Sequence, residues 1–146
     1  MQTYNLTVRR VINAPVEKVF AAWTDQNMAK QWLSPESHTV LDAKIETKVG
    51  GAYRIVMSDD KGQKPTTNGV VKELVPNKKL VFTWQWEGQE MAGDGETLVS
   101  LDFKPMGEDK TELILTHTEF KSEKSKENHN HGWESCFNRL EKALAN

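Results

Sequence analysis

The end of the chain carries the clearest hydrophobic period. Between Lys124 and Leu144, apolar residues recur at intervals of three and four, at Trp133, Cys136, Phe137, Leu140, Ala143 and Leu144. This spacing places them on one face of a helix, and no proline interrupts the run. Ser122 or Ser125 can cap its start, because a serine hydroxyl accepts a hydrogen bond from a free backbone N–H. The pattern predicts one long amphipathic C-terminal helix.

Gly132 lies inside this predicted helix. A glycine in a helix interior costs about 1 kcal/mol relative to alanine. It indicates a close approach of a neighbouring element or the mouth of a cavity, with a tolerated defect as the alternative.

The N-terminal part alternates between strand and helix signals. Apolar and polar residues alternate from Tyr4 to Ile12, which is typical of a strand. Pro15 then stands at the start of a helix whose apolar face is Val16, Val19, Phe20 and Trp23. Asp25 can cap a second short helix that runs to Leu33.

From His38 onward the chain reads as strand after strand. The six expected strands span residues 40–48, 52–58, 66–75, 79–86, 97–104 and 111–117. An antiparallel sheet needs a cover for its apolar face, and the C-terminal helix is the element long enough to supply it. We therefore expect an α+β fold with one strand, two short helices, six further antiparallel strands and a long helix gripped by the curved sheet. A cavity between helix and sheet is a natural consequence.

Composition restricts the classes of function. The 146 residues carry 19 basic and 21 acidic side chains, without the basic stripe that nucleic-acid binding requires. No apolar run reaches the length of a membrane span. The single cysteine, Cys136, fits a reducing compartment, and charged residues interrupt the first twenty positions. We expect one domain over residues 1–146, located in the cytoplasm, with no membrane span.

Several segments together resemble a known family. They are INAPVEKVFAAWTD, QWLSP, KVGGAYRIVM, GVVKELVPNKKLVFTWQW, FKPMGEDKTELILTHTEF and HGWESCFNRLEKAL, in this order. The chain resembles the family related to the activator of heat-shock-protein-90 ATPase, within the START-like (SRPBCC) superfamily. The resemblance implies the helix-grip fold. One departure is the Trp32-Leu33 pair followed by Ser34, where the family often has a second tryptophan and a glycine.

The resemblance leaves three functions open. The superfamily implies an internal cavity that binds lipids, polyketides, hormones or other hydrophobic molecules, and this is the function that we favour. The family name implies an interaction module that regulates a chaperone ATPase in the stress response. The third alternative is a cyclase or dehydratase acting on polyketide-like substrates. The expected partner is a small hydrophobic or aromatic molecule, with a chaperone as the alternative, and the chain is expected to be a monomer or a weak homodimer.

The ligand site is expected on the inward faces of the strands and the long helix. The expected lining residues are Tyr53, Met57, Trp84, Trp86, Leu113, Leu115, His117, Trp133 and Phe137. Tryptophan buries well but its N–H needs a partner, which a cavity water or a polar ligand group could supply. Access is expected between the helix and the loops at residues 34–38 and 87–95.

Catalytic and metal sites are not expected. Catalysis needs several converging polar groups, and only His117, Arg54 and Tyr53 are available on the inward side. Cys136 lies on the apolar helix face, where a thiol is inert. His129 and His131 are two residues apart and point to different sides of a helix, so they cannot share a metal. No glycine-rich phosphate loop is present, so we expect no cofactor.

Overall fold

The computed structural model describes residues 3–88 and 94–145. Its elements follow one another in the predicted order: β1 (Tyr4–Ile12), α1 (Val16–Thr24), α2 (Gln26–Trp32), β2 (Thr39–Ile45), β3 (Ala52–Ser58), β4 (Thr66–Val75), β5 (Lys79–Trp86), β6 (Thr97–Pro105), β7 (Thr111–Phe120) and α3 (Glu123–Ala143). The α+β prediction of one strand, two short helices, six strands and a long helix is confirmed.

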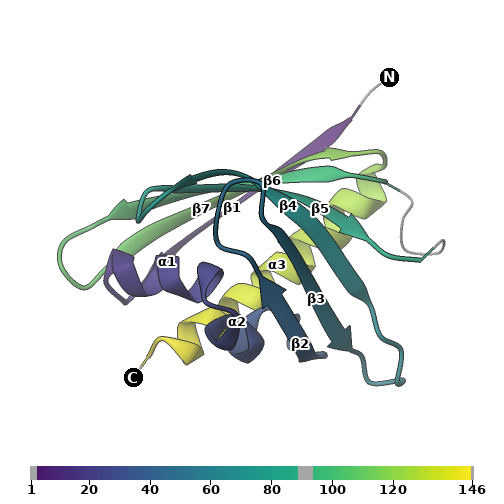
Figure 1. Cartoon of the computed structure of the whole chain (residues 1–146), viewed down its shortest axis with the longest axis horizontal. Helices are drawn as coiled ribbons and strands as arrows, with labels where there is room; N and C mark the ends of the chain where they lie inside the picture. Colours follow the sequence, from purple (N-terminus) through teal and green to yellow (C-terminus); the bar gives the residue numbers. More distant parts are fainter. Residues whose placement is uncertain (1–2, 89–93, 146) are drawn as a thin grey trace.

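The strands form one antiparallel sheet that curves around α3. Its order is β1-β7-β6-β5-β4-β3-β2, so the first strand of the chain joins the last strand at one edge. In Figure 1 the sheet arches over α3, while β2 and β3 reach down along the other side of the helix. The two short helices lie together near the C-terminal end of α3. This arrangement is the helix-grip fold.

Local sequence signals set the helix boundaries. The Ser122 hydroxyl accepts from the Ser125 N–H at 3.1 Å and caps α3. The Asp25 carboxylate accepts from the Asn27 N–H at 2.9 Å and caps α2 in the same way. Both satisfy backbone donors that a helix start leaves free. Of the two serines considered for α3, Ser122 is the cap.

The core lies where α3 packs against β1 and β7, with β6 next to them in the sheet. Phe137 and Leu140 are fully buried there, facing the inward side chains of the sheet. These inward residues are Leu6, Val8, Val99, Leu101, Leu113 and Leu115. Trp23 and Trp32 close the core at the short helices, with ring centroids 4.6 Å apart. Of the helix residues predicted to pack against the sheet, Trp133, Phe137 and Leu140 are buried, whereas Leu144 at the end of α3 is only partly buried.

At Gly69, the backbone of β4 lies very close to Tyr53 of β3 and to Thr83 of β5. A side chain at Gly69 would overlap the Tyr53 ring and the Thr83 backbone. The Tyr53 hydroxyl uses this space to donate to the Thr83 carbonyl at 2.5 Å, and the Thr83 hydroxyl accepts from the Val70 N–H at 2.8 Å. Glycine is therefore required here so that the two strands and the phenol can approach closely.

No helix in residues 3–88 and 94–145 is long and apolar enough to cross a membrane.

Candidate functional site

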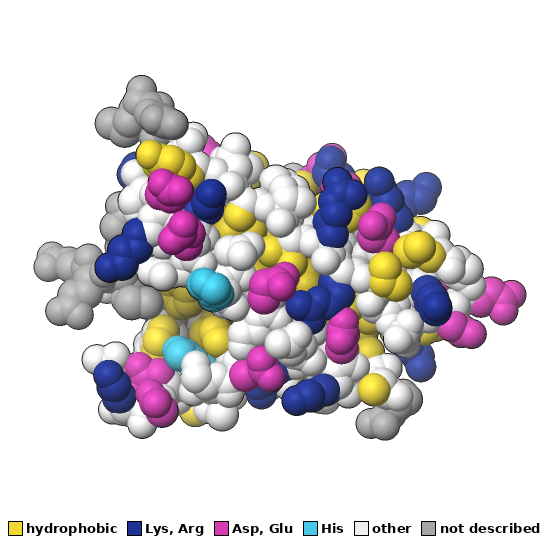
Figure 2. Space-filling model, turned by 180° about the vertical axis from the view of Figure 1, so that it is seen from behind, with side chains coloured by type: hydrophobic (Ala, Val, Ile, Leu, Met, Phe, Trp, Pro, Cys, Tyr) yellow, Lys and Arg dark blue, Asp and Glu magenta, His cyan; other side chains and the backbone are white. Residues whose placement is uncertain are grey.

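A cavity of about 610 Å³ lies between α3 and the β3–β5 side of the sheet. Figure 2 shows a hollow on this face of the molecule, with hydrophobic side chains at its bottom and histidine at its border. The cavity is lined by residues of α3, of β3 and β5, and of the adjoining loops. They are Leu33, Pro35, His38, Met57, Pro65, Trp84, Trp86, Asp94, Lys121, Ser122, Lys124, Ser125, Asn128, His129, Gly132, Trp133 and Cys136.

The residues that α3 contributes form one continuous stripe. They are Lys124, Ser125, Asn128, His129, Gly132, Trp133 and Cys136, spaced alternately by one and three residues. This is the pattern of a single helix face. The stripe runs beside the core-facing residues Phe137 and Leu140, so one side of α3 packs into the core and an adjacent side borders the cavity.

Gly132 stands in the middle of the cavity-facing stripe. A Cβ built at this position meets nothing within 4 Å, so no neighbouring element requires the glycine. The φ angle of Gly132 is not positive, so its backbone conformation does not require a glycine either. Of the three interpretations of Gly132, the structure therefore excludes a close approach of a neighbour and places the residue in the cavity wall.

Three tryptophans form the aromatic wall of the cavity. The ring centroids of Trp84 and Trp133 lie 4.9 Å apart. Those of Trp84 and Trp86 lie 5.5 Å apart, with their planes nearly perpendicular at 88°. Edge-to-face packing of this kind is favourable and holds each ring in a fixed orientation.

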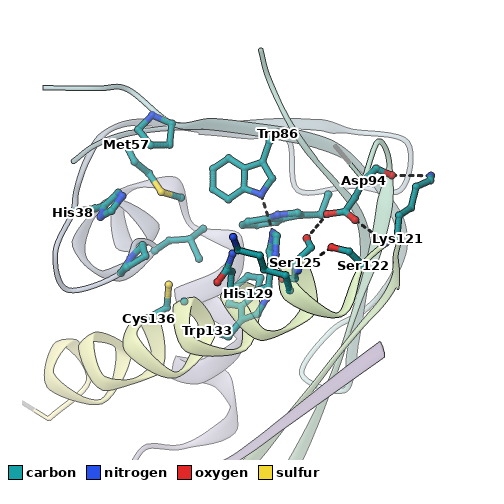
Figure 3. A pocket seen from close by; sticks show the side chains of 17 residues that line it. His38, Met57, Trp86, Asp94, Lys121, Ser122, Ser125, His129, Trp133 and Cys136 are labelled. Carbon is teal, nitrogen blue, oxygen red and sulfur yellow. Dashed lines mark hydrogen bonds between the residues drawn. The ribbon is translucent and has the colours of Figure 1, made fainter. Parts of the chain in front are cut away.

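Two histidines, the buried His117 and the half-buried His129, accept hydrogen bonds from indole N–H groups of this wall. Trp86 Nε1 donates to His129 Nε2 at 2.9 Å, as Figure 3 shows. Trp133 Nε1 donates to His117 Nδ1 at 3.1 Å. For these two indoles, side chains supply the partner that we expected from a cavity water or a ligand. Trp84 Nε1 is buried and has no hydrogen-bond partner among the described residues.

The hydrogen bonds assign one neutral tautomer to each histidine. His129 accepts at Nε2, so its proton is on Nδ1 and is donated to the Ser125 carbonyl at 2.8 Å. Thr97 has one hydroxyl proton, which it donates to the Trp84 carbonyl at 2.8 Å. Thr97 Oγ1 therefore accepts from His117 Nε2 at 2.7 Å, and His117 Nδ1 is free to accept from Trp133.

Burial keeps both imidazoles neutral. Desolvation, with a smaller contribution from neighbouring His129, lowers the pKa of His117 from 6.5 to about 2. Desolvation also lowers the pKa of His129, against the opposing effects of the Ser125 carbonyl and Asp94. A protonated imidazole would have no lone pair for an indole N–H. The neutral state is thus the one that keeps the tryptophan wall in place.

Polar residues gather at the end of the cavity beside the start of α3. The Asp94 carboxylate accepts from the Lys121 backbone N–H at 2.7 Å through Oδ1 and from the Ser125 hydroxyl through Oδ2. Lys121 Nζ donates to the Asp94 carbonyl at 2.9 Å. Figure 3 shows these groups together at one side of the pocket, away from Met57 and Cys136.

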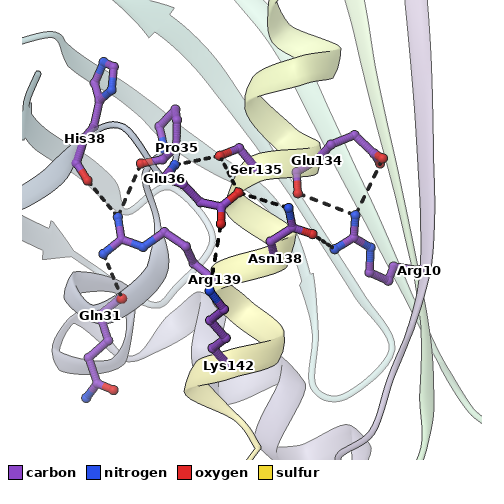
Figure 4. A network of polar contacts seen from close by, with 10 residues as sticks. All are labelled: Arg10, Gln31, Pro35, Glu36, His38, Glu134, Ser135, Asn138, Arg139 and Lys142. Carbon is purple, nitrogen blue, oxygen red and sulfur yellow. Dashed lines mark hydrogen bonds and ion pairs between the residues drawn. The ribbon is translucent and has the colours of Figure 1, made fainter.

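The opposite end of the cavity is closed by the loop that follows α2. Arg139 on α3 donates from Nη1 to the Ser34 hydroxyl at 2.5 Å and to the His38 carbonyl at 2.9 Å. Figure 4 shows the contact between Arg139 and the His38 carbonyl, together with that of Glu36, whose backbone N–H donates to the Ser135 hydroxyl at 2.6 Å. Ser34, the departure from the family pattern, is fully buried as an acceptor for Arg139.

The nine residues expected to line the ligand site divide into two groups. Met57, Trp84, Trp86 and Trp133 border the cavity. Leu113, Leu115, His117 and Phe137 are fully buried in the core beneath α3, and Tyr53 borders a separate void of about 30 Å³. They face the concave side as expected, but α3 and the tryptophan wall separate them from the open space. Of the two loops expected at the mouth, 34–38 contributes Pro35 and His38, and 87–95 contributes Asp94. Residues 89–93 of the second loop lie outside the described residues.

Most of the polar lining does not follow from the predictions made from the sequence. Those predictions treat His129 only as a possible metal ligand, although it lies four residues from both Ser125 and Trp133 on the stripe that contains Gly132. That spacing was the available signal. Asp94 lies in a loop that was expected at the mouth, but no local pattern indicates its hydrogen bonds to Lys121 and Ser125.

The polar groups considered for catalysis do not converge on the cavity. Arg54 lies on the outer face, where Nε donates to Glu87 Oε2 at 2.8 Å. The Tyr53 hydroxyl is buried against Thr83, and desolvation raises its pKa well above 10.0. Both His117 ring nitrogens are engaged. None of the three faces the open space.

Cys136 borders the cavity as a free thiol. Burial raises its pKa to about 12, so the reactive thiolate is scarce at neutral pH. In the described part of the chain, no three His, Cys, Asp or Glu side chains are grouped so that they could hold a metal ion.

Known structures share this architecture along almost the whole chain. A protein from Silicibacter pomeroyi is 28% identical with a TM-score of 0.86, and the match covers 97% of this chain and 98% of that one. A protein from Chromobacterium violaceum is 25% identical with a TM-score of 0.83, covering 96% of each chain. One from Mesorhizobium loti is 26% identical with a TM-score of 0.79, covering 97% of each.

No curated protein matches the sequence. The family model described as Activator of Hsp90 ATPase homolog 1-like protein matches residues 13–145, which include all of the elements except β1. The resemblance noted from the sequence is confirmed. The chain belongs to the Activator of Hsp90 ATPase homolog 1-like family.

Proposed function

We propose that this protein binds a small, flat hydrophobic or aromatic molecule in the cavity beside α3. Gly132 carries the proposal. It lowers the stability of α3, no neighbouring element requires it, and its missing side chain enlarges the cavity. A glycine in this position is best explained by a ligand that needs the space.

The size and the walls of the cavity support a small-molecule ligand. A volume of about 610 Å³ lies within the range of pockets that hold drug-sized molecules. Because the N–H groups of Trp86 and Trp133 are bound by histidines, these two rings offer apolar faces to the cavity. Met57 adds an adaptable apolar side chain. This combination suits a planar apolar body.

A chaperone interaction would rest on the family description alone. Such a surface requires a contiguous exposed apolar patch. In the described part of the chain, the large exposed hydrophobic residues are distributed over β1, β2, β4 and two turns: Val11, Leu41, Val49, Val70, Val75 and Met106. The cavity is the stronger candidate. The free thiol of Cys136 suits a reducing compartment, so we expect binding in the cytoplasm.

The proposal can be tested by fluorescence titration with planar aromatic compounds. Binding should quench tryptophan emission, because three tryptophans form the wall, and should raise the melting temperature. We expect dissociation constants in the micromolar range, equivalent to about 8 kcal/mol.

Two leucine variants of α3 locate the binding. Gly132→Leu fills part of the cavity and should abolish the quenching of tryptophan emission by the compounds. Glu127→Leu adds the same side chain at an exposed position outside the cavity lining and should leave the titration unchanged. A panel that gives neither quenching nor a thermal shift, or binding that survives in Gly132→Leu, would refute the proposal.

A further inference from the structure

The cavity changes in chemistry along its length. Its lining on α3 extends from Lys124 to Cys136, which at 1.5 Å per residue corresponds to about 18 Å. Lys124, Ser125 and Asn128 lie at the start of this stretch, next to Asp94 and Lys121. Towards the other end follow the tryptophan wall and then Cys136. A ligand that fills the whole length therefore needs one polar end and one apolar end.

At the polar end of the cavity, the Asp94 carboxylate is already engaged in hydrogen bonds, whereas one lysine ammonium is not. Both oxygens of the Asp94 carboxylate already accept hydrogen bonds, from Lys121 and Ser125. Lys121 Nζ is held by the Asp94 carbonyl. Among the described residues, no carboxylate or carbonyl pairs with Lys124 Nζ, and the Asn128 amide, one helical turn further, makes no side-chain hydrogen bond. The polar groups that remain available to a ligand are therefore the Lys124 ammonium and the Asn128 amide.

We infer that the ligand is an amphipathic anion whose carboxylate-like head is bound by Lys124 and Asn128 and whose flat apolar body lies against Trp84, Trp86 and Trp133. This inference rests on the proposed function and specifies its ligand class. His129 does not compete with Lys124 for the head, because its Nδ1–H is donated to the Ser125 carbonyl and its Nε2 accepts from Trp86. A cation would have to compete with Lys121 and Ser125 for Asp94.

Three probes with one aromatic body and different heads test the inference. They are anthracene carboxylate, anthracene methanol and anthracene methylamine, titrated by energy transfer from tryptophan at physiological salt. A charge-assisted contact at a solvent-exposed end corresponds to about 1.4 kcal/mol, or tenfold. We expect the carboxylate to bind about tenfold more tightly than the alcohol, and the amine more weakly than both.

Charge variants of α3 assign the preference to a residue. Lys124→Glu should weaken carboxylate binding at least tenfold, leave alcohol binding unchanged and improve amine binding. Lys126→Glu changes the net charge equally on the same helix but lies outside the cavity lining, so it should preserve the order of the probes. Asn128→Ala should weaken carboxylate binding by a smaller factor.

The outcomes separate this inference from the proposed function. If none of the three probes binds, the proposed function fails. If all three bind equally well, or if the amine binds best, the inference about the head group is wrong while the binding site stands. If Lys124→Glu and Lys126→Glu have the same effect, the assignment to Lys124 is wrong, because only the net charge then matters.

Discussion

Two adjacent sides of α3 differ in how they are packed. On one side, Phe137 and Leu140 are fully buried against the sheet. On the other, Lys124, Asn128 and Gly132 border a cavity of about 610 Å³. Both sides belong to one 21-residue helix, so the difference does not arise from secondary structure. It comes from where the sheet touches the helix and where it curves away.

The comparison shows that one side of α3 stabilises the fold, whereas the adjacent side leaves space for the cavity. Apolar burial on the packed side stabilises the fold. The cavity side buries less apolar surface and therefore contributes less stability. The histidine–tryptophan pairs form the boundary between them, since His117 is fully buried while its partner Trp133 reaches the cavity. Substitutions on the two sides should therefore have different consequences.

The largest expected effect is on the packed side. Phe137→Ala should lower the free energy of unfolding by about 3–5 kcal/mol, because it leaves a void in a close-packed core. Cys136→Ala, one residue away in the cavity wall, should cost less than about 1 kcal/mol. Urea denaturation measures both. Equal losses for the two variants would contradict the distinction between the sides.

The next effect concerns the loop that closes the cavity at residues 33–38. Arg139→Ala removes charge-assisted hydrogen bonds to Ser34 and His38 and should cost about 1.5–3 kcal/mol. Lys142→Ala, whose exposed ammonium lies 4.0 Å from Glu36, should stay within about 0.5 kcal/mol. Amide exchange in the loop should accelerate in Arg139→Ala only. Unchanged exchange there would show that Arg139 does not hold the loop.

The histidines at the boundary between the two sides should make the stability of the protein depend on pH. The unfolded chain protonates His117 below pH 6.5, whereas the folded chain keeps it neutral down to about pH 2. The unfolded state then binds more protons, so stability falls with falling pH, by up to about 1.4 kcal/mol per pH unit for each such histidine. His129 shifts in the same direction.

Unfolding free energies measured from about pH 7 to pH 5 test this pH dependence. His117→Gln cannot titrate and should give a shallower slope than the wild type. His131→Gln, at an exposed position of α3, should give the wild-type slope. A wild-type stability that stays constant or increases on acidification would contradict the neutral state of the buried imidazole.

The smallest expected effect is a stabilisation on the cavity side. Gly132→Ala should raise the free energy of unfolding by about 1 kcal/mol, because alanine favours the helix and its methyl group meets nothing within 4 Å. Ligand binding should persist, since one methyl group takes up little of the cavity. A loss of stability would indicate a contact that the free space around Gly132 does not predict.

The order of elements could be predicted from the sequence because periodicity is a local property. Along β5, Leu80, Phe82, Trp84 and Trp86 occupy alternate positions, so the sequence alone indicates that they share a face. The spacing from Trp133 to Leu140 likewise indicates the packed side of α3. Residue type and position identified Asp25 as a cap and Ser122 as one of two candidate caps.

The extent of the cavity could not be predicted in the same way. Leu113 and Leu115 share the inward face with Met57, yet α3 covers the first two and leaves Met57 at the cavity. Alternation gives the face of a residue but not the point at which the helix leaves the sheet. Likewise, the pairing of Trp86 with His129 joins residues 43 positions apart, which no local pattern encodes.

The central claim is that Gly132 keeps the cavity open for a ligand at the expense of helix stability. One experiment tests it directly: equilibrium unfolding and titration with a binding aromatic probe, measured on the same preparation of Gly132→Leu. The account predicts that the variant is more stable than the wild type and no longer binds the probe. A Gly132→Leu protein that still binds, or that is less stable than the wild type, would contradict it.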